Sequence, residues 1–156
     1  MPAVTVREGR GERGLQGGFS LVEAVAALVL VGVLLAAALP AWQRNVAYKR
    51  LVMAQLVLVE DLRAAEQRAR SERTDFCVRV VGGSPARVET GRGACADAQV
   101  VQVTDLPPGI APQQPYEVGY DPLGRATAGA EWVLLDAYGR SKTVQVRQDG
   151  RVEPGP

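Results

Sequence analysis

At 156 residues the chain has room for one modest domain, and its composition argues against several classes of function. It carries 18 Lys and Arg against 17 Asp and Glu, and a net charge of +1 gives none of the general basic character of a nucleic-acid binder. It has no histidine, the commonest general base and metal ligand. Its two cysteines do not supply the roughly four ligands of a zinc site. We therefore expect no enzymatic activity, no metal and no cofactor.

The N-terminal part of the sequence consists of a polar leader and a long apolar stretch. Residues 1–18 contain arginines and glycines without apolar periodicity, as in a leader peptide. The stretch at residues 19–40 has one charged side chain, Glu23. Its roughly 21 residues measure about 31 Å as an α-helix, which is enough to cross the ~30 Å hydrocarbon core of a bilayer. The sequence predicts one transmembrane helix here.

The carboxylate of Glu23 is the anomaly in this apolar stretch. An intramembrane acid is costly and generally marks a functional group with a partner. The nearest cations in the sequence are Arg13 before it and Arg44 after it. If the chain is cut between Gly18 and Phe19, a new α-ammonium appears four residues before Glu23, and a neighbouring copy can present that ammonium to this carboxylate. Cleavage therefore offers the acid a partner.

Residues 18–23 read Gly-Phe-Ser-Leu-Val-Glu and precede about twenty apolar residues, which resembles the processing site of type IV pilins and of the pseudopilins of type II secretion. The resemblance implies that a prepilin peptidase cleaves between Gly18 and Phe19 and that Phe19 is N-methylated. It also implies that Glu23 pairs with the N-terminus of an adjacent subunit during assembly. Pro40 stands where many family members have a proline that bends or loosens the helix.

Two other interpretations of the N-terminal stretch stay open. An ordinary secretory signal would be cleaved after the small residues Ala36–Ala38 or within Ala38–Ala41, before Trp42. A plain single-pass anchor would tether an exported domain that does not polymerise. Both leave Glu23 without a purpose, and the apolar stretch exceeds the usual ~7–15 residues of a signal peptide. Pilin-like processing is the interpretation that we favour.

Beyond Pro40 an amphipathic helix is predicted at residues 41–73. Leu51, Leu58 and Ala65 recur every seven residues, while charged side chains fill the other faces of this helix. The charged side chains include Glu60 and Asp61, and Glu66 and Arg70 are spaced for an i, i+4 pair.

Residues 74–156 are predicted to form a β-rich exported domain, because short β-branched runs alternate there with Gly and Pro. The predicted strands are Asp75–Val81, Ala86–Glu89, Ala98–Thr104, Tyr116–Tyr120, Glu131–Ala137, Lys142–Arg147 and Arg151–Glu153. Asp149-Gly150 is a hairpin signal. The fold class is α+β, with a long N-terminal helix packed on a C-terminal antiparallel β-sheet.

This C-terminal half resembles the GspH/FimT group, which joins the H-type minor pseudopilins of type II secretion with FimT-type minor pilins. The resemblance rests on residues 120–125, the strand at 132–135, and residues 144–146 leading into 150–152. It implies a minor subunit, working near the tip or in initiation of a secretion pseudopilus or a type IV pilus. The precursor would sit in the bacterial inner membrane with its C-terminal domain in the periplasm, and its partners would be the prepilin peptidase and other pilin subunits.

Cys77 and Cys95 both lie beyond the apolar stretch. In an oxidising compartment they are expected to form a disulfide, which closes a loop of about 18 residues and stabilises the fold by roughly 3 kcal/mol in the chain-entropy model. Two buried free thiols are the alternative. The disulfide would join the first strand to the loop before the third.

DNA capture is the second functional hypothesis. FimT-like pilins implicated in DNA uptake carry Gly-Arg-x-Arg near the C-terminus, whereas residues 150–153 here are Gly-Arg-Val-Glu. A small basic patch for DNA phosphates is still conceivable. Its members would be Arg140, Lys142, Arg147 and Arg151. Ordinary surface charge beside neighbouring acids is the simpler interpretation of these side chains.

Overall fold

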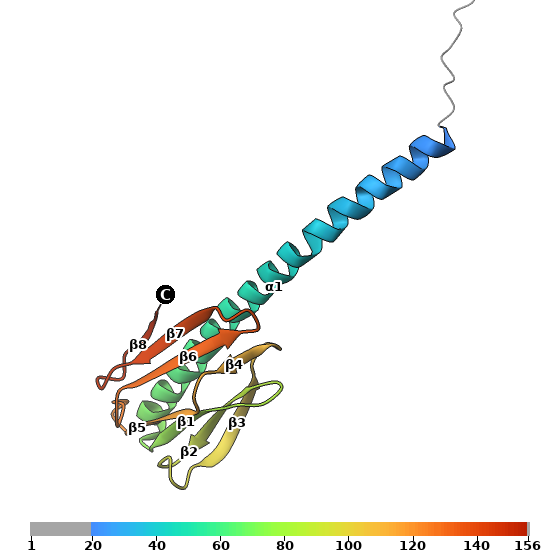
Figure 1. The fold of residues 1–156 in the computed structure, drawn as a ribbon. Helices are drawn as coiled ribbons and strands as arrows, with labels where there is room; N and C mark the ends of the chain where they lie inside the picture. Colours follow the sequence, from blue (N-terminus) through green and yellow to red (C-terminus); the bar gives the residue numbers. More distant parts are fainter. Residues whose placement is uncertain (1–19, 156) are drawn as a thin grey trace, which may run out of the picture. The chain divides into compact units, whose positions relative to one another are not determined.

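The computed structural model describes residues 20–155, which form one long helix followed by eight short strands (Figure 1). The helix is α1 (Leu21–Glu72). The chain divides into two compact units, one ending at Leu39 and the other beginning at Pro40, so that α1 belongs to both. Each unit is described by itself.

The second unit contains all the strands. They are β1 (Phe76–Val81), β2 (Arg87–Arg92), β3 (Gln99–Asp105), β4 (Ile110–Pro112), β5 (Tyr116–Tyr120), β6 (Ala130–Asp136), β7 (Ser141–Val146) and β8 (Val152–Pro154). The long helix and the antiparallel pairing make this an α+β fold, as predicted.

The strands form two four-stranded sheets rather than the single sheet that the sequence suggested. Their orders are β3-β2-β1-β5 and β4-β6-β7-β8. The chain passes from one sheet to the other between β3 and β4, between β4 and β5, and between β5 and β6, where it folds back and Tyr120 forms an isolated bridge with Ala126. β5 therefore pairs with β1, and β6 pairs with β4 and β7.

One strand was missed and one was ended three residues too early, while the other predicted bounds lie within one residue of those observed. β4 was missed because it has only three residues and ends in Pro112, which suits an edge strand. β2 was ended too early, since Gly91 looks like a breaker. In the structure Gly91 lies at an irregularity in the pairing with β3, where an added Cβ would come within 2.8 Å of the Cβ of Ala98.

The part of α1 in the second unit provides one side of the hydrophobic core. Its fully buried side chains follow the predicted seven-residue repeat and include Leu51, Leu58 and Ala65. Side chains of both sheets complete the same cluster, among them Val78 from β1 and Trp132 from β6. The helix thus packs on both sheets through a single apolar stripe.

Polar contacts attach α1 to the strands at specific points. The side-chain amide of Gln55 donates hydrogen bonds to the carbonyl oxygens of Thr143 (2.7 Å) and Gly155 (2.8 Å). On the other sheet, the amide of Gln102 donates to the carboxylate of Asp61 (3.1 Å). The helix face toward the sheets is therefore not purely apolar.

Candidate assembly site

The first turn of α1 holds Glu23. The helix begins at Leu21, and the N–H of Ala24 donates to the carbonyl of Ser20 at 3.0 Å. Gly18 and Phe19, the predicted cleavage and methylation positions, lie outside the described residues. A carboxylate in the first turn is favoured by the helix dipole, typically by about 0.3–1 kcal/mol, and Ser20 three residues before Glu23 fits a capping-box sequence. Glu23 therefore also suits the start of the helix itself.

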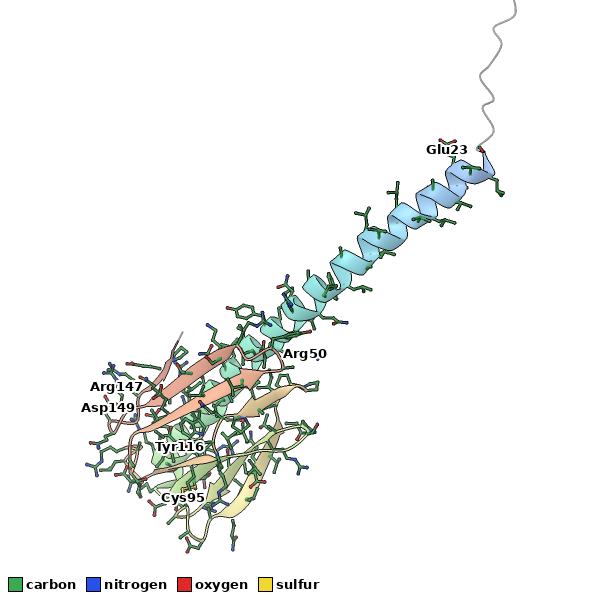
Figure 2. The ribbon with its side chains drawn as sticks, in the orientation of Figure 1. Glu23, Arg50, Cys95, Tyr116, Arg147 and Asp149 are labelled. Atoms are coloured by element: carbon green, nitrogen blue, oxygen red, sulfur yellow. A yellow bond between two sulfur atoms is a disulfide. The ribbon has the colours of Figure 1, made fainter. Side chains whose placement is uncertain are left out.

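No residue of α1 before Pro40 is buried in its own chain. Leu21 is 83% exposed, and every described side chain of this unit lies in the exposed class. Figure 2 shows these side chains projecting from all sides of the helix, with Glu23 at its first turn. The segment is long and apolar enough to cross a membrane. A continuous apolar surface of this size requires a lipid or protein environment.

No ion pair involving Glu23 is formed within residues 20–155. The first cation after it in the sequence is Arg44, which belongs to the other unit. In an apolar environment a lone carboxylate is stabilised only by a paired cation or by protonation. A cation for Glu23 must then come from the chain's own N-terminus or from another molecule.

Pro40 lies inside α1, at the first residue of the second unit. Proline has no N–H, so the helical hydrogen bond to the carbonyl of Ala36 is missing, and its ring crowds that preceding turn. The helix is therefore weakest at the boundary between its wholly exposed part and its partly buried part.

A disulfide joins Cys77 to Cys95, as expected from the sequence. Cys77 is in β1, and Cys95 is in the loop between β2 and β3. The guanidinium of Arg79 donates to the carbonyl of Cys95 (3.1 Å) and pairs with Glu117 of β5 (2.9 Å). The disulfide and this arginine both hold the loop against the β1–β5 side of the sheet.

Three tight turns in the second unit share one geometry and place three arginines. Each has a glycine with positive φ followed by an arginine: Gly124-Arg125, Gly139-Arg140 and Gly150-Arg151. In each, the N–H of the glycine donates to the carbonyl three residues earlier, at 2.8–3.1 Å. The positive φ of +76° to +86° explains the glycine.

An aspartate at the start of the turn fixes Arg140. Asp136 accepts hydrogen bonds from the N–H groups of Tyr138 (2.8 Å) and Arg140 (3.0 Å), and its carboxylate pairs with the guanidinium of Arg140 at 2.7 Å. Burial by itself raises the pKa of Asp136, but these hydrogen bonds outweigh it and hold the pKa below its ordinary value. Asp121 binds Arg125 in the same way.

The structure does not bring the four basic residues of the DNA hypothesis into one free patch. Arg140 and Lys142 lie at one end of β7 and Arg147 and Arg151 beyond the other, and six strand residues span about 20 Å. Arg140 is held by Asp136, by the carbonyl of Arg44 and by the ring of Tyr48 (5.2 Å). Arg147 pairs with Glu153 at 2.8 Å. Within residues 20–155, Lys142 and Arg151 form no ion pair.

Sequence periodicity misplaced Asp61. It was assigned to the charged outer face of the helix, but it is 8% exposed and faces Gln102 of β3. Burial raises the pKa of its carboxyl, and its second oxygen has no hydrogen-bond partner among the described residues. Its place beside the buried Leu58 and Leu62, three residues before and one after, was the only available signal.

Comparisons with known proteins agree with this geometry. The sequence model of the family described as "Prokaryotic N-terminal methylation motif" matches residues 13–39. Two crystal structures of the type IV minor pilin FimU of Pseudomonas aeruginosa, strain PAO1, share the fold. For the P21 crystal form the TM-score is 0.59 and the sequence identity is 14%, and the match covers 70% of this chain and 90% of the FimU chain. For the P65 form the TM-score is 0.56 and the identity is 14%, and the match covers 68% of this chain and 93% of the FimU chain. No curated protein sequence matches the chain.

The chain thus combines a prokaryotic N-terminal methylation motif with a fold similar to that of a type IV minor pilin. The matched segment contains the Gly18-Phe19 bond and Glu23, and it ends at Leu39, where the first unit ends. The closeness to the GspH/FimT group stays a prediction from the sequence.

Proposed function

We propose that the chain is the precursor of a minor pilin or pseudopilin that is cleaved between Gly18 and Phe19, methylated on Phe19 and assembled into a thin helical filament. One observation carries the proposal. The methylation motif spans residues 13–39, and in the helical segment at residues 21–39 every side chain is exposed and the only charge is Glu23. Such a helix suits first a membrane and then a bundle of like helices.

In this proposal Glu23 selects the position of each subunit in the bundle. The new ammonium of Phe19 on one subunit pairs with Glu23 of another, and the low dielectric of an apolar bundle makes an unpaired charge far more costly than a paired one. A subunit that is out of register leaves both charges unpaired. Pro40 contributes by removing one helical hydrogen bond, which lets the helix adjust between membrane and filament.

Substitutions at Glu23 distinguish this role from a local role at the helix start. Glu23→Gln retains a side chain suited to a capping box but loses the charge, and Glu23→Asp keeps the charge near the helix dipole. We expect Glu23→Gln and Glu23→Ala to abolish incorporation into sheared filaments, and Glu23→Asp to retain part of it. The measurement is the amount of the subunit in filaments, relative to the amount in the membrane.

Glu60→Gln is the matched control, because Glu60 is an exposed acid on the same helix within the second unit. It should assemble normally. Normal filament incorporation of Glu23→Ala would contradict the assembly role and leave Glu23 as a helix-start residue.

FimU is a type IV minor pilin, and the likeness of its fold to the fold of this chain supports the proposal that the chain is a minor subunit. We place the chain near the tip or in initiation of a type IV pilus or a type II secretion pseudopilus, with its β domain in the periplasm before assembly. We expect this protein to be scarce relative to the major subunit in purified filaments.

DNA binding is the second candidate, and it is favoured by Arg151, which forms no ion pair with any residue of the described range 20–155. Arg151 lines an open polar groove together with Arg63 and Arg70 of α1, although Glu66 and Asp149 line it too. Binding of the full chain to duplex DNA at low salt should then weaken with Arg151→Ala and with rising salt, since phosphate contacts release counterions. Arg147→Ala, which removes an arginine paired with Glu153, is the matched control. Equal binding by both variants would remove this candidate.

A further inference from the structure

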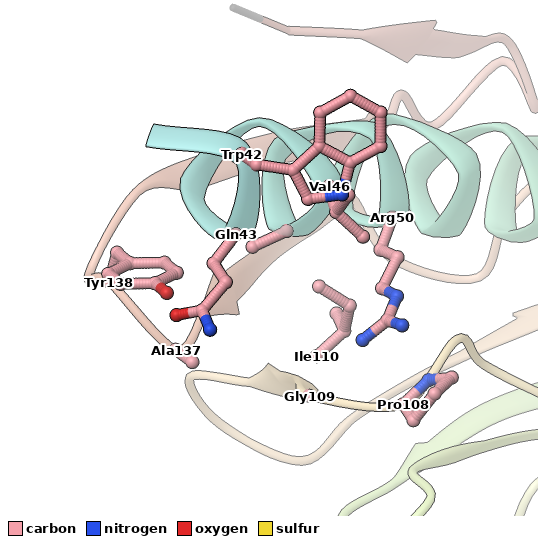
Figure 3. A pocket seen from close by; sticks show the side chains of 10 residues that line it. Trp42, Gln43, Val46, Arg50, Pro108, Gly109, Ile110, Ala137 and Tyr138 are labelled. Carbon is pink, nitrogen blue, oxygen red and sulfur yellow. The ribbon is translucent and has the colours of Figure 1, made fainter. Parts of the chain in front are cut away.

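An open groove of about 410 Å³ lies in the second unit beside the first turns of α1 after Pro40. Trp42, Gln43 and Arg50 are among the helix residues that line it. The opposite wall consists of residues 108–110, which lead into β4, and of Ala137 and Tyr138 in the turn after β6. In Figure 3, Gln43 and Arg50 extend from the helix toward these loops. The groove therefore opens where the chain of the second unit begins.

Three cations lie on the turns of α1 that follow Pro40, and of these Arg50 lines the groove. Arg44, Lys49 and Arg50 are all exposed, and none of them forms an ion pair within residues 20–155. No Asp or Glu occurs between Glu23 and Glu60, and the groove lining contains no acid. The carboxylate of Asp136, the last residue of β6, already pairs with Arg140. A chain of net charge +1 thus concentrates positive charge here.

Exposed aromatic side chains accompany these cations. Trp42 is 73% exposed, which is unusual for so large a ring, and Tyr48 and Tyr138 are 40% and 47% exposed. Trp and Tyr combine an apolar body with a polar edge, and for this reason they gather at the headgroup level of membranes. An exposed Trp between a long apolar helix and a group of cations is what an interfacial segment requires.

Chain connectivity limits the distance between Trp42 and the end of the apolar segment at Leu39. Trp42 follows Leu39 by three residues, so their Cα atoms are at most about 11 Å apart. The headgroup layer of one leaflet is about 5–7 Å thick. Trp42 and Arg44 can therefore reach it directly, while Lys49 and Arg50 act on it through their long side chains and through a surface potential that extends about 8–10 Å.

We propose that Trp42, Arg44, Lys49 and Arg50 form a surface that binds the headgroups of anionic phospholipids. This interfacial surface rests on the membrane-anchored precursor stage of the proposed function. Anionic headgroups supply the negative charge that the three cations do not find within residues 20–155, and the interface accommodates the exposed indole. Contact with anionic lipid favours the precursor in the membrane, so entry into a filament must break it.

The test uses the full chain reconstituted in vesicles of zwitterionic phosphatidylcholine, with or without one part in three of anionic phosphatidylglycerol. Trp42 and Trp132 are the only tryptophans, and Trp132 is 1% exposed, so quenching by aqueous acrylamide reports mainly on Trp42. Three cations near an anionic surface shift the equilibrium toward the docked state roughly 100-fold, so we expect acrylamide to quench Trp42 less in the anionic vesicles. High salt should restore the quenching.

Two variants of equal charge separate a local surface from net charge. The triple variant Arg44→Gln, Lys49→Gln, Arg50→Gln should lose the difference between the two vesicle types. The control Arg63→Gln, Arg68→Gln, Arg73→Gln removes two other cations of α1 and one directly after it, none of which forms an ion pair within residues 20–155, and it should keep the difference. Equal quenching in both vesicle types, or equal effects of the two triple variants, would overturn the proposal.

Flotation with zwitterionic vesicles after an alkaline wash reports membrane anchoring separately. A chain that floats but shows no lipid-dependent protection of Trp42 refutes the interfacial surface and leaves the anchored precursor intact. A chain that does not float refutes both. Protection of Trp42 that rises with protein density equally in both vesicle types would mean that a second copy covers the groove, and it would also overturn the proposal.

Discussion

The two parts of α1 are both rich in apolar residues, yet they are apolar for different reasons. Before Pro40 no side chain is buried in the chain itself, whereas after it Leu51, Leu58 and Leu62 are completely buried against the two sheets. The first part depends on partners outside the chain, and the second part is the core of its own domain. Composition alone does not separate these cases, but the presence of polar residues at regular spacing does.

Paired leucine substitutions test this contrast with the largest expected effect. Leu58 is 0% exposed, and Leu58→Ala should lower the free energy of unfolding of the β domain by about 2–5 kcal/mol through lost burial and a cavity. Leu34 is 69% exposed, and Leu34→Ala should change it by less than about 0.5 kcal/mol. Thermal unfolding of the full chain in detergent measures both, and equal effects would contradict the division at Pro40.

Removal of the disulfide should have an effect of intermediate size that is confined to the second unit. The double variant Cys77→Ser, Cys95→Ser should lower the free energy of unfolding by roughly 3 kcal/mol, because the unfolded chain regains the freedom of the closed loop. Denaturant unfolding with and without reductant is the measurement. Membrane anchoring through residues 21–39 should be unchanged, and a loss of anchoring would show that the two units are not independent.

The smallest effect is a pH dependence from Asp136. The folded state lowers the pKa of this carboxyl through the hydrogen bonds of Tyr138 and Arg140, so it contributes stability above the unfolded-state pKa of about 3.9. That contribution is lost as the pH falls through the lower folded-state pKa. Asp136→Asn should therefore be less stable than the wild type at pH 7, and the difference should vanish in acid. A constant difference across this range would assign the effect to packing instead.

Local chemistry was sufficient to predict much of the fold. β5 was predicted with its exact bounds, and Glu66 and Arg70 form the expected pair at 2.7 Å. The hairpin at Asp149-Gly150 joins β7 to β8 as the dipeptide indicated. These features depend on residues that are close in sequence, where turn geometry and side-chain spacing decide the structure.

Features that depend on distant residues were not accessible from the sequence. The division into two sheets depends on pairings between strands that are far apart in the chain, such as β1 with β5 and β4 with β6, and no local pattern specifies them. The burial of Asp61 depends on Gln102, which lies 41 residues away. The sequence did place the charge of Glu23 on the helix start, because that position needs only the order of residues.

Mass spectrometry of the mature protein from its native host tests the central claim most directly. The account predicts a chain that begins with N-methylated Phe19, because only that cleavage supplies the ammonium for Glu23 of a neighbour. A chain that begins at Trp42 would mean that the apolar segment is a signal peptide. A chain that still begins at Met1 would mean that it is a plain anchor, and either result would contradict the account.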